Sequence, residues 1–330
     1  MNTKTNSYIL IGLVSVLFLA SCASVPSSFN EEAASTDPTS ASSYSNETPT
    51  SSEEPTTLPD NNIFGSISDT IYLKPGSVNI DGIGDFEYNP EEIKTVRDDL
   101  FNNGHFSIFD ILIHLDETKQ IDMRFHFDEA MNTHVIESIN KQKNWWYAAY
   151  YDGGWLEKNI FRMDHYPYKE RMFIALYQID EQELQSNYDV FREEVARKQA
   201  NEGQTIIPVV LINGQRNNLE FNDVVLEAHD LRTDVLQPGT ITAMDAIMTL
   251  GDQGLISYDL QWYESVGSAG IVKDYFVDRI NEDTTFNRCG FVYEAGAEEN
   301  FLGRGNHIHI PPDNRILNSP EYVQFFWICI

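Results

Sequence analysis

The feature that most constrains the fold of this chain is an internal duplication. Residues 96–115 align without a gap to residues 231–250, and five of the twenty aligned positions are identical. The identical pairs are Arg97 and Arg232, Asp99 and Asp234, Gly104 and Gly239, Asp110 and Asp245, and Leu115 and Leu250. Because an internal repeat encodes one structural unit more than once, we expect two domains of similar topology.

Each copy contains a signal for the start of a short helix. The pattern is Ser107-x-x-Asp110 in the first copy and Thr242-x-x-Asp245 in the second, and an apolar run accompanies each. This spacing resembles a capping box, in which the hydroxyl accepts from an orphan backbone N–H and the acid reaches back. Asp110 and Asp245 could instead be catalytic carboxylates, but the capping role is favoured by the pattern.

The segments around each expected helix favour β-strands. Strand-like stretches precede the helices and carry Pro-Gly and Asn-Gly turn signals. After the helices, both copies show a stretch that ends in Ile-Asn, an aromatic strand and a closing apolar strand. In order, these are Ile139-Asn140 and Ile280-Asn281, residues 144–154 and 288–296, and residues 172–179 and 323–330.

These signals predict an α+β fold with two tandem domains, at residues 61–180 and 204–330. The segment between them, residues 181–203, is rich in Glu, Gln, Lys and Arg, which is typical of a solvated connecting helix. Residues 23–60 contain 16 Ser or Thr, 5 Pro and no Lys or Arg. Such a composition cannot bury enough apolar surface to fold, so we expect a disordered tether.

The N-terminus carries a targeting signal in residues 1–22. An apolar run of about twelve residues, 8–19, suits a signal peptide and is too short to span a bilayer. It leads into Leu19-Ala20-Ser21-Cys22, which resembles the lipobox of bacterial lipoproteins. That resemblance implies acyl chains on Cys22, which would anchor the chain outside the cytoplasm, at the cell surface or the periplasmic face. The alternatives are an uncleaved anchor and an ordinary secretory signal with a chance cysteine.

The net charge limits the kinds of partner that the chain can bind, and the cysteine count bears on disulfide formation. The chain has 51 Asp and Glu against 22 Lys and Arg, a net charge of −29, which argues against a nucleic-acid partner. If Cys22 is lipidated, Cys289 and Cys329 remain as a pair in an oxidising setting. They could form one disulfide, and two buried free thiols are the alternative.

The layout of each copy resembles the domain family DUF4430, which is related to the C-terminal domain of transcobalamin and intrinsic factor. The shared features are the T/S-x-x-D helix start, the strand ending near Ile-Asn, the segment 145–153 and the closing apolar strand. The resemblance implies two β-grasp-like domains, each a small mixed sheet packed on a helix. It does not imply cobalamin binding, because the helical domain that completes that site has no counterpart here, and we expect no cofactor.

Two groups of side chains are candidates for function. His307 and His309 would lie on one face of a strand, and Asp313 could join them in a zinc site, although such histidines are more often structural. The second group is an aromatic cluster in residues 145–155. Consecutive aromatic residues cannot all face one side of a sheet, so some could bind a ligand, unless both faces are covered. The candidates for ligand binding are Trp145, Trp146, Tyr150 and Trp155.

We therefore expect a non-enzymatic, membrane-anchored surface lipoprotein whose tandem domains bind a ligand or a partner protein. One alternative is an exported metal-dependent hydrolase that uses the region of His307 and His309. Another is a structural or adhesive spacer of the cell envelope. Motifs of serine hydrolases, zinc proteases and nucleotide-binding loops do not occur in the sequence.

Overall fold

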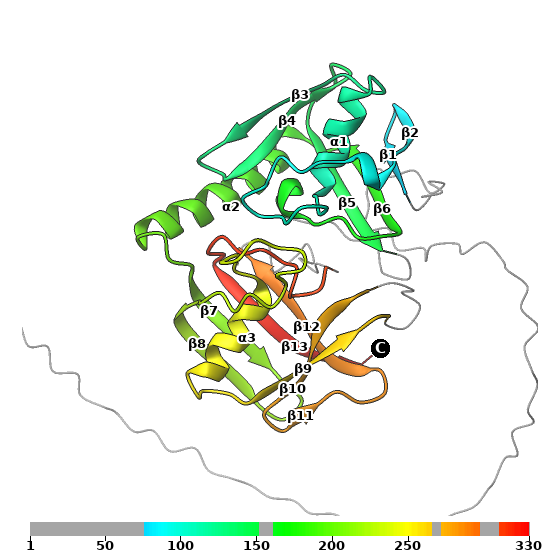
Figure 1. Ribbon diagram of the computed structural model, residues 1–330. Helices are drawn as coiled ribbons and strands as arrows, with labels where there is room; N and C mark the ends of the chain where they lie inside the picture. Colours follow the sequence, from blue (N-terminus) through cyan, green and yellow to red (C-terminus); the bar gives the residue numbers. More distant parts are fainter. Residues whose placement is uncertain (1–75, 152–160, 266–271, 298–309, 330) are drawn as a thin grey trace, which may run out of the picture. The chain divides into compact units, whose positions relative to one another are not determined.

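Two four-stranded sheets with the same strand order organise this computed structural model, which describes residues 76–151, 161–265, 272–297 and 310–329. The first sheet has the order β2-β1-β6-β5 and the second β8-β7-β13-β12 (Figure 1). In each sheet the central pair, β1 with β6 or β7 with β13, is parallel and the outer pairs are antiparallel. The strands are β1 Ser77–Ile80, β2 Gly84–Glu87, β5 Trp145–Tyr151, β6 Met172–Gln178, β7 Ile206–Asn213, β8 Asn218–Val225, β12 Cys289–Gly296 and β13 Tyr322–Cys329.

Each half also contributes one helix and a separate outer hairpin. The helices are α1 Ile108–Glu117 and α3 Ala243–Asp252. The first hairpin pairs β3 Met123–Asp128 with β4 Thr133–Ile139, and the second pairs β9 Tyr258–Tyr263 with β10 Asp274–Ile280, to which β11 Asp283–Thr284 is added. Short 3-10 helices lie at η1 Pro90–Glu92 and η2 Met163–His165. The predicted α+β class is confirmed, and the two halves contain matching elements.

Both helices begin with the capping box that the sequence predicts. The Asp110 carboxylate accepts from the backbone N–H of Ser107 at 2.7 Å, and Asp245 accepts from that of Thr242 at 2.6 Å. Both carboxylates are buried and also accept an upstream backbone N–H, from Val96 in the first half. Their role is therefore to satisfy orphan donors at a helix start.

The repeated Ile-Asn pattern marks a second structural feature that both halves share. Asn140 and Asn281 adopt positive φ, which Asn tolerates better than most residues. Each exchanges two hydrogen bonds with the segment that leads into the outer hairpin: Asn140 with Asp122, and Asn281 with Ser257, all at 2.8–2.9 Å. The asparagine therefore closes the end of the hairpin in each copy.

The connecting segment forms α2, Glu181–Ala200, and one face of this helix is buried. Leu184, Tyr188 and Phe191 belong to the apolar core of the first half. The prediction of a helix is confirmed, but the prediction that it is solvated is wrong for this face. Among the described residues, no helix has the length and apolar character needed to cross a membrane.

The two halves meet through reciprocal hydrogen bonds. Asn102 donates its backbone N–H to the carbonyl of Val235, and Gln237 donates its own to that of Leu100, both at 2.9 Å. Their side-chain amides repeat the exchange, with Leu236 and Phe101 as acceptors at 2.9 and 3.0 Å. Asn102 and Gln237 occupy equivalent positions of the repeat, so the junction has the reciprocal character of a two-fold interface. The described residues of both halves belong to one compact unit.

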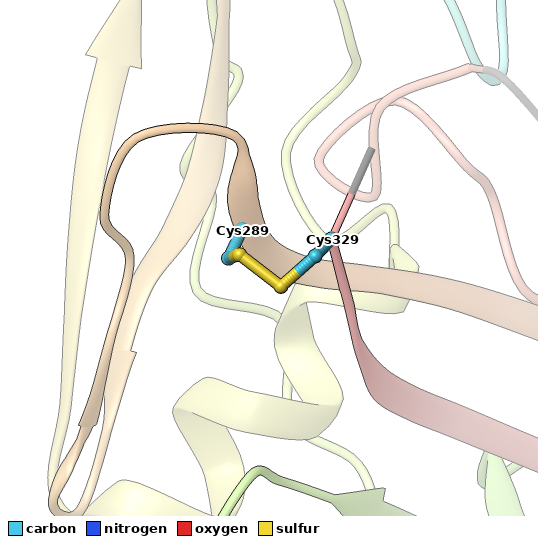
Figure 2. The surroundings of a disulfide bond; sticks show 2 residues. All are labelled: Cys289 and Cys329. Carbon is cyan, nitrogen blue, oxygen red and sulfur yellow. A yellow bond between two sulfur atoms is a disulfide. The ribbon is translucent and has the colours of Figure 1, made fainter. Parts of the chain in front are cut away.

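A disulfide joins Cys289 and Cys329, the pair left over by the sequence argument (Figure 2). The two residues lie directly opposite each other on the neighbouring strands β12 and β13, with Cα atoms 4.0 Å apart. The bridge therefore ties the end of the closing strand to the aromatic strand of the second half.

Candidate functional site

The predicted aromatic ligand face is a core surface wherever its side chains are described. Trp145 is 1% exposed and Trp146 is 6% exposed. The Trp145 indole donates to the carbonyl of Gln142 at 2.9 Å, and the Trp146 ring lies 6.2 Å from those of Tyr188 and Phe191. Their assignment to ligand binding is therefore wrong, because α2 covers the outer side of the sheet. The side chain of Tyr150 and all of Trp155 lie outside the described residues.

Cys22, His307 and His309 also lie outside the described residues. The described third member of the proposed zinc site, Asp313, is buried and accepts hydrogen bonds from Arg232 and from the backbone of Tyr275, both at 2.9 Å. Within the described ranges, no group of three or more His, Cys, Asp or Glu could hold a metal ion. Asp313 is thus engaged in a protein network.

Two buried arginines organise equivalent networks at the junction. Arg97 makes a bidentate contact with Asp99 at 2.7 and 2.8 Å and donates to Asp164 at 2.9 Å. Arg232 makes the equivalent contacts in the second half. It forms a bidentate contact with Asp234 at 2.9 and 3.0 Å and donates to Asp313. The carbonyl of each arginine also accepts the backbone N–H groups of the turn that carries the junction. The duplicated Arg and Asp of the sequence therefore fix the turn through which the halves meet.

Each arginine also lies against an aromatic ring of the outer hairpin. The distance from the guanidinium carbon to the ring centre is 5.6 Å for Arg97 and Phe127, and 5.5 Å for Arg232 and Trp262. Phe127 is 43% exposed, and Phe125 on the same face of β3 is 37% exposed. Phe127 and Trp262 are equivalent in the repeat, so both halves present an aromatic ring on the hairpin, beside a fixed arginine.

Carboxylates border these aromatic rings. Asp99 and Asp234 are more than half exposed, although their positions are fixed by the bidentate arginines. In the second half, the Trp262 indole also donates to Glu264 at 2.8 Å. Sequence reasoning missed this surface. The available signal was the alternation Phe125-His126-Phe127, which places two aromatic side chains on one face of a strand.

The buried carboxylates of the two networks differ in charge environment. In the first half, Asp164 accepts from Thr133, His134 and Arg97. Burial opposes its ionisation, but the neighbouring His165, followed by these three donors, outweighs burial and holds the pKa of Asp164 below its ordinary value. Asp164 is therefore an ionised, fully engaged structural group.

In the second half, Asp274 stands where the first half has Thr133. Asp274 and Asp313 share the Arg232 Nη1, at 2.6 and 2.9 Å, and both accept from Asn314. Lys169 of the first half reaches Asp274 at 2.5 Å. Burial and the neighbouring Asp274 raise the pKa of Asp313 to about 7.

The cavity beside this cluster is too small for an organic substrate. Arg232, Thr240, Asp245 and Asp313 are among its lining residues, and its volume is about 10 Å³. That volume is at the lower limit for a single water molecule. The perturbed carboxylate pair therefore has a role in joining the halves, and the exposed aromatic rings are the better candidate for a binding surface.

Comparison with known proteins finds no matching family model, no similar curated protein and no similar solved structure. The resemblances to the lipobox and to DUF4430 remain predictions that rest on the sequence motifs alone.

Proposed function

We propose that the protein is an extracytoplasmic lipoprotein, anchored in the membrane through acyl chains on Cys22. Its two β-grasp-like halves would bind a ligand or a partner protein without catalysing a reaction. The observation that carries the binding role is the exposed aromatic face of the hairpin β3–β4, at Phe125 and Phe127, with a counterpart at Trp262 in the second half.

The β-grasp-like assignment is supported by the strand order of each half. A parallel central pair is formed by the first and last strands of the unit, and one helix lies between them in sequence. A parallel pair requires a crossover connection, which α1 or α3 and the hairpin supply. This is the arrangement expected from the resemblance to DUF4430.

The binding role is supported by the character of the hairpin surface. Large aromatic side chains left partly exposed beside polar groups favour contacts with carbohydrates, peptides or proteins. Phe127 is held in place on one side by Arg97, and the adjacent Asp99 cannot rotate freely because two hydrogen bonds fix it. An aromatic ring and a carboxylate in fixed positions lower the entropy lost when a ligand binds.

The test is a binding screen with the full-length chain in a non-ionic detergent, against immobilised glycans and peptides. Any ligand found is then measured with Phe127→Ala and Trp262→Ala variants. Phe286→Ala is the matched control, because Phe286 is 48% exposed but its ring lies against Trp327 of β13. We expect affinity to fall at least tenfold in the hairpin variants and to stay unchanged in the control. Equal affinity in all three variants would contradict the proposal.

A metal analysis separates this proposal from the hydrolase alternative. The full-length chain is purified without chelators, and its zinc content is compared with that of a His307→Ala, His309→Ala variant. The binding proposal predicts substoichiometric zinc in both. One equivalent of zinc that is lost in the variant would favour the hydrolase.

A further inference from the structure

Arg315 is a buried cation without a carboxylate partner. Its side chain belongs to the second half, is 3% exposed as a residue, and lies with its guanidinium carbon 3.6 Å from the ring centre of Phe161. Its one hydrogen bond joins Nη1 to the carbonyl of Ile316 at 3.3 Å. Nε has no acceptor, and the described residues place no carboxylate within 4 Å of the guanidinium. Buried charges are normally paired, because desolvation is costly.

The charged residues that act most strongly on Arg315, Glu194 and Arg162, are already paired with each other. Arg162 forms a salt bridge with Glu194, and it donates further to the carbonyls of Met131 at 2.7 Å and Phe191 at 3.0 Å. Glu194 also attracts Arg315 electrostatically, but its direct contact goes to Arg162, so no anion among the described residues touches the guanidinium of Arg315. Burial lowers the pKa of Arg315, and the charge of Glu194 only partly opposes this.

The tyrosines around Arg315 leave it without an anion. The Tyr147 hydroxyl donates to the carbonyl of Phe161 at 2.8 Å, and the Tyr293 hydroxyl donates to that of Ile310 at 2.6 Å. Their protons are therefore engaged. Burial raises the pKa of both tyrosines well above the ordinary value, so neither becomes a phenolate that could neutralise Arg315.

The internal repeat shows that the fold does not need a cation at this position. The residue equivalent to Arg315 in the first half is Tyr166: the backbone carbonyl of each accepts the first N–H of the helix, from Ile108 at 3.0 Å and from Ala243 at 2.8 Å. The same structural unit is thus built with a neutral aromatic residue in one copy and a guanidinium in the other. The charge of Arg315 is an addition to the fold.

We propose that Arg315 is the anion-recognising residue of a binding site for a small carboxylate-bearing ligand. The planar guanidinium can hold a carboxylate through two parallel hydrogen bonds, and its Nε is free to make one of them. One carboxylate would supply the anion in direct contact that Arg315 lacks. A phosphate dianion would place a second negative charge against aromatic side chains and near Glu194, so a monoanion fits the site better. This site is separate from the hairpin surface and does not depend on it.

The test is a thermal-shift titration of the full-length chain in a non-ionic detergent, at constant ionic strength. The probes are sodium acetate, sodium benzoate, sodium phosphate and the neutral benzamide. We expect a saturable rise of Tm with the carboxylates, a weaker response to phosphate and none to benzamide. Arg315→Lys keeps the charge but not the planar fork, so we expect at least tenfold weaker carboxylate binding.

Two further variants separate a ligand site from a structural arginine. Arg315→Met removes an unpaired buried charge, so it should abolish the carboxylate response and raise the Tm of the ligand-free chain. Arg279→Met is the control, because Arg279 pairs with Asp259 on the surface and should leave the response unchanged. The absence of a carboxylate response in the wild-type chain, a response that survives in Arg315→Met, or a stronger response to phosphate would overturn the proposal.

Discussion

The salt bridge between Lys169 and Asp274 offers the sharpest test of how the two halves are joined. Lys169 comes from the first half and Asp274 from the second, and their charged atoms lie 2.5 Å apart in a largely buried setting. In a Lys169→Met variant, Asp274 keeps its hydrogen bonds from Arg232 and Asn314. It loses its salt bridge with Lys169, and it shares the other cation, Arg232, with Asp313. Breaking a buried pair from one side costs about 3–5 kcal/mol. For a chain of this size, that corresponds to a Tm lower by roughly 6–20 °C.

The loss should depend on pH in a direction that the pKa fixes. Burial raises the pKa of Asp274, and Lys169 and Arg232 only partly oppose this. A folded-state pKa above the unfolded value means that stability is lost as the pH rises and the carboxylate ionises. Without Lys169 the pKa of Asp274 rises further, so the variant should be closest to wild type in mild acid. Urea denaturation followed by tryptophan fluorescence gives the free energy of unfolding of the variant and of wild type at pH 5 and at pH 8.

A double variant completes the test. In Lys169→Met, Asp274→Thr the unpaired carboxylate is gone, and the threonine copies Thr133 at the equivalent position of the first half. We expect most of the lost stability to return. A single variant that loses less than about 1 kcal/mol at pH 8, or a double variant as unstable as the single one, would refute the reasoning.

Three further outcomes are expected. Replacing Cys289 and Cys329 by serine opens a loop with a sequence separation of 40; guanidinium denaturation should show a loss of about 4 kcal/mol, and an equal stability under oxidising conditions would contradict the bridge. Asp274→Thr should bring the pKa of Asp313 down from about 7, so that stability no longer falls as the pH rises through 7; a carboxyl NMR titration that still gives 7 would exclude Asp274 as a cause. Trp146→Ala should cost about 3–5 kcal/mol as a core truncation, whereas unchanged stability would show that α2 does not cover this ring.

The parts of the fold that the sequence predicts are those with local or repeated signals. The capping boxes at Ser107 and Thr242 are short-range patterns with one dominant structural meaning, so they transfer directly to helix starts. The duplication then relates the six described strands β1–β6 of the first half to β7, β8, β9, β10, β12 and β13 of the second. A count of the cysteines left Cys289 and Cys329 as a pair if Cys22 is lipidated, and the structure joins these two rather than leaving two free thiols.

The parts that sequence reasoning missed depend on contacts between distant segments. Trp146 is covered by α2, a helix whose polar composition hides a buried face, because Asn187 and Glu194 are buried beside its apolar residues. Glu194 is stabilised there by Arg162, a partner 32 positions away that no local pattern indicates.

Local sequence patterns also did not indicate the roles of the duplicated arginines and of the exposed aromatic ring. The identity of Arg97 and Arg232 was visible in the sequence, but the turn and the junction that they fix bring together residues about 135 positions apart. The exposure of Phe127 depends on which face of β3 is left uncovered. Alternation along a strand shows that two faces exist and not which one is buried.

The central proposal is that acyl chains on Cys22 hold the folded part of this chain at a membrane. Metabolic labelling with radioactive palmitate, followed by immunoprecipitation and membrane fractionation, measures it directly. The account predicts that the wild-type chain carries label and sediments with the membrane, and that Cys22→Ser loses both properties. An unlabelled wild-type chain, or a Cys22→Ser variant that fractionates like wild type, would contradict it.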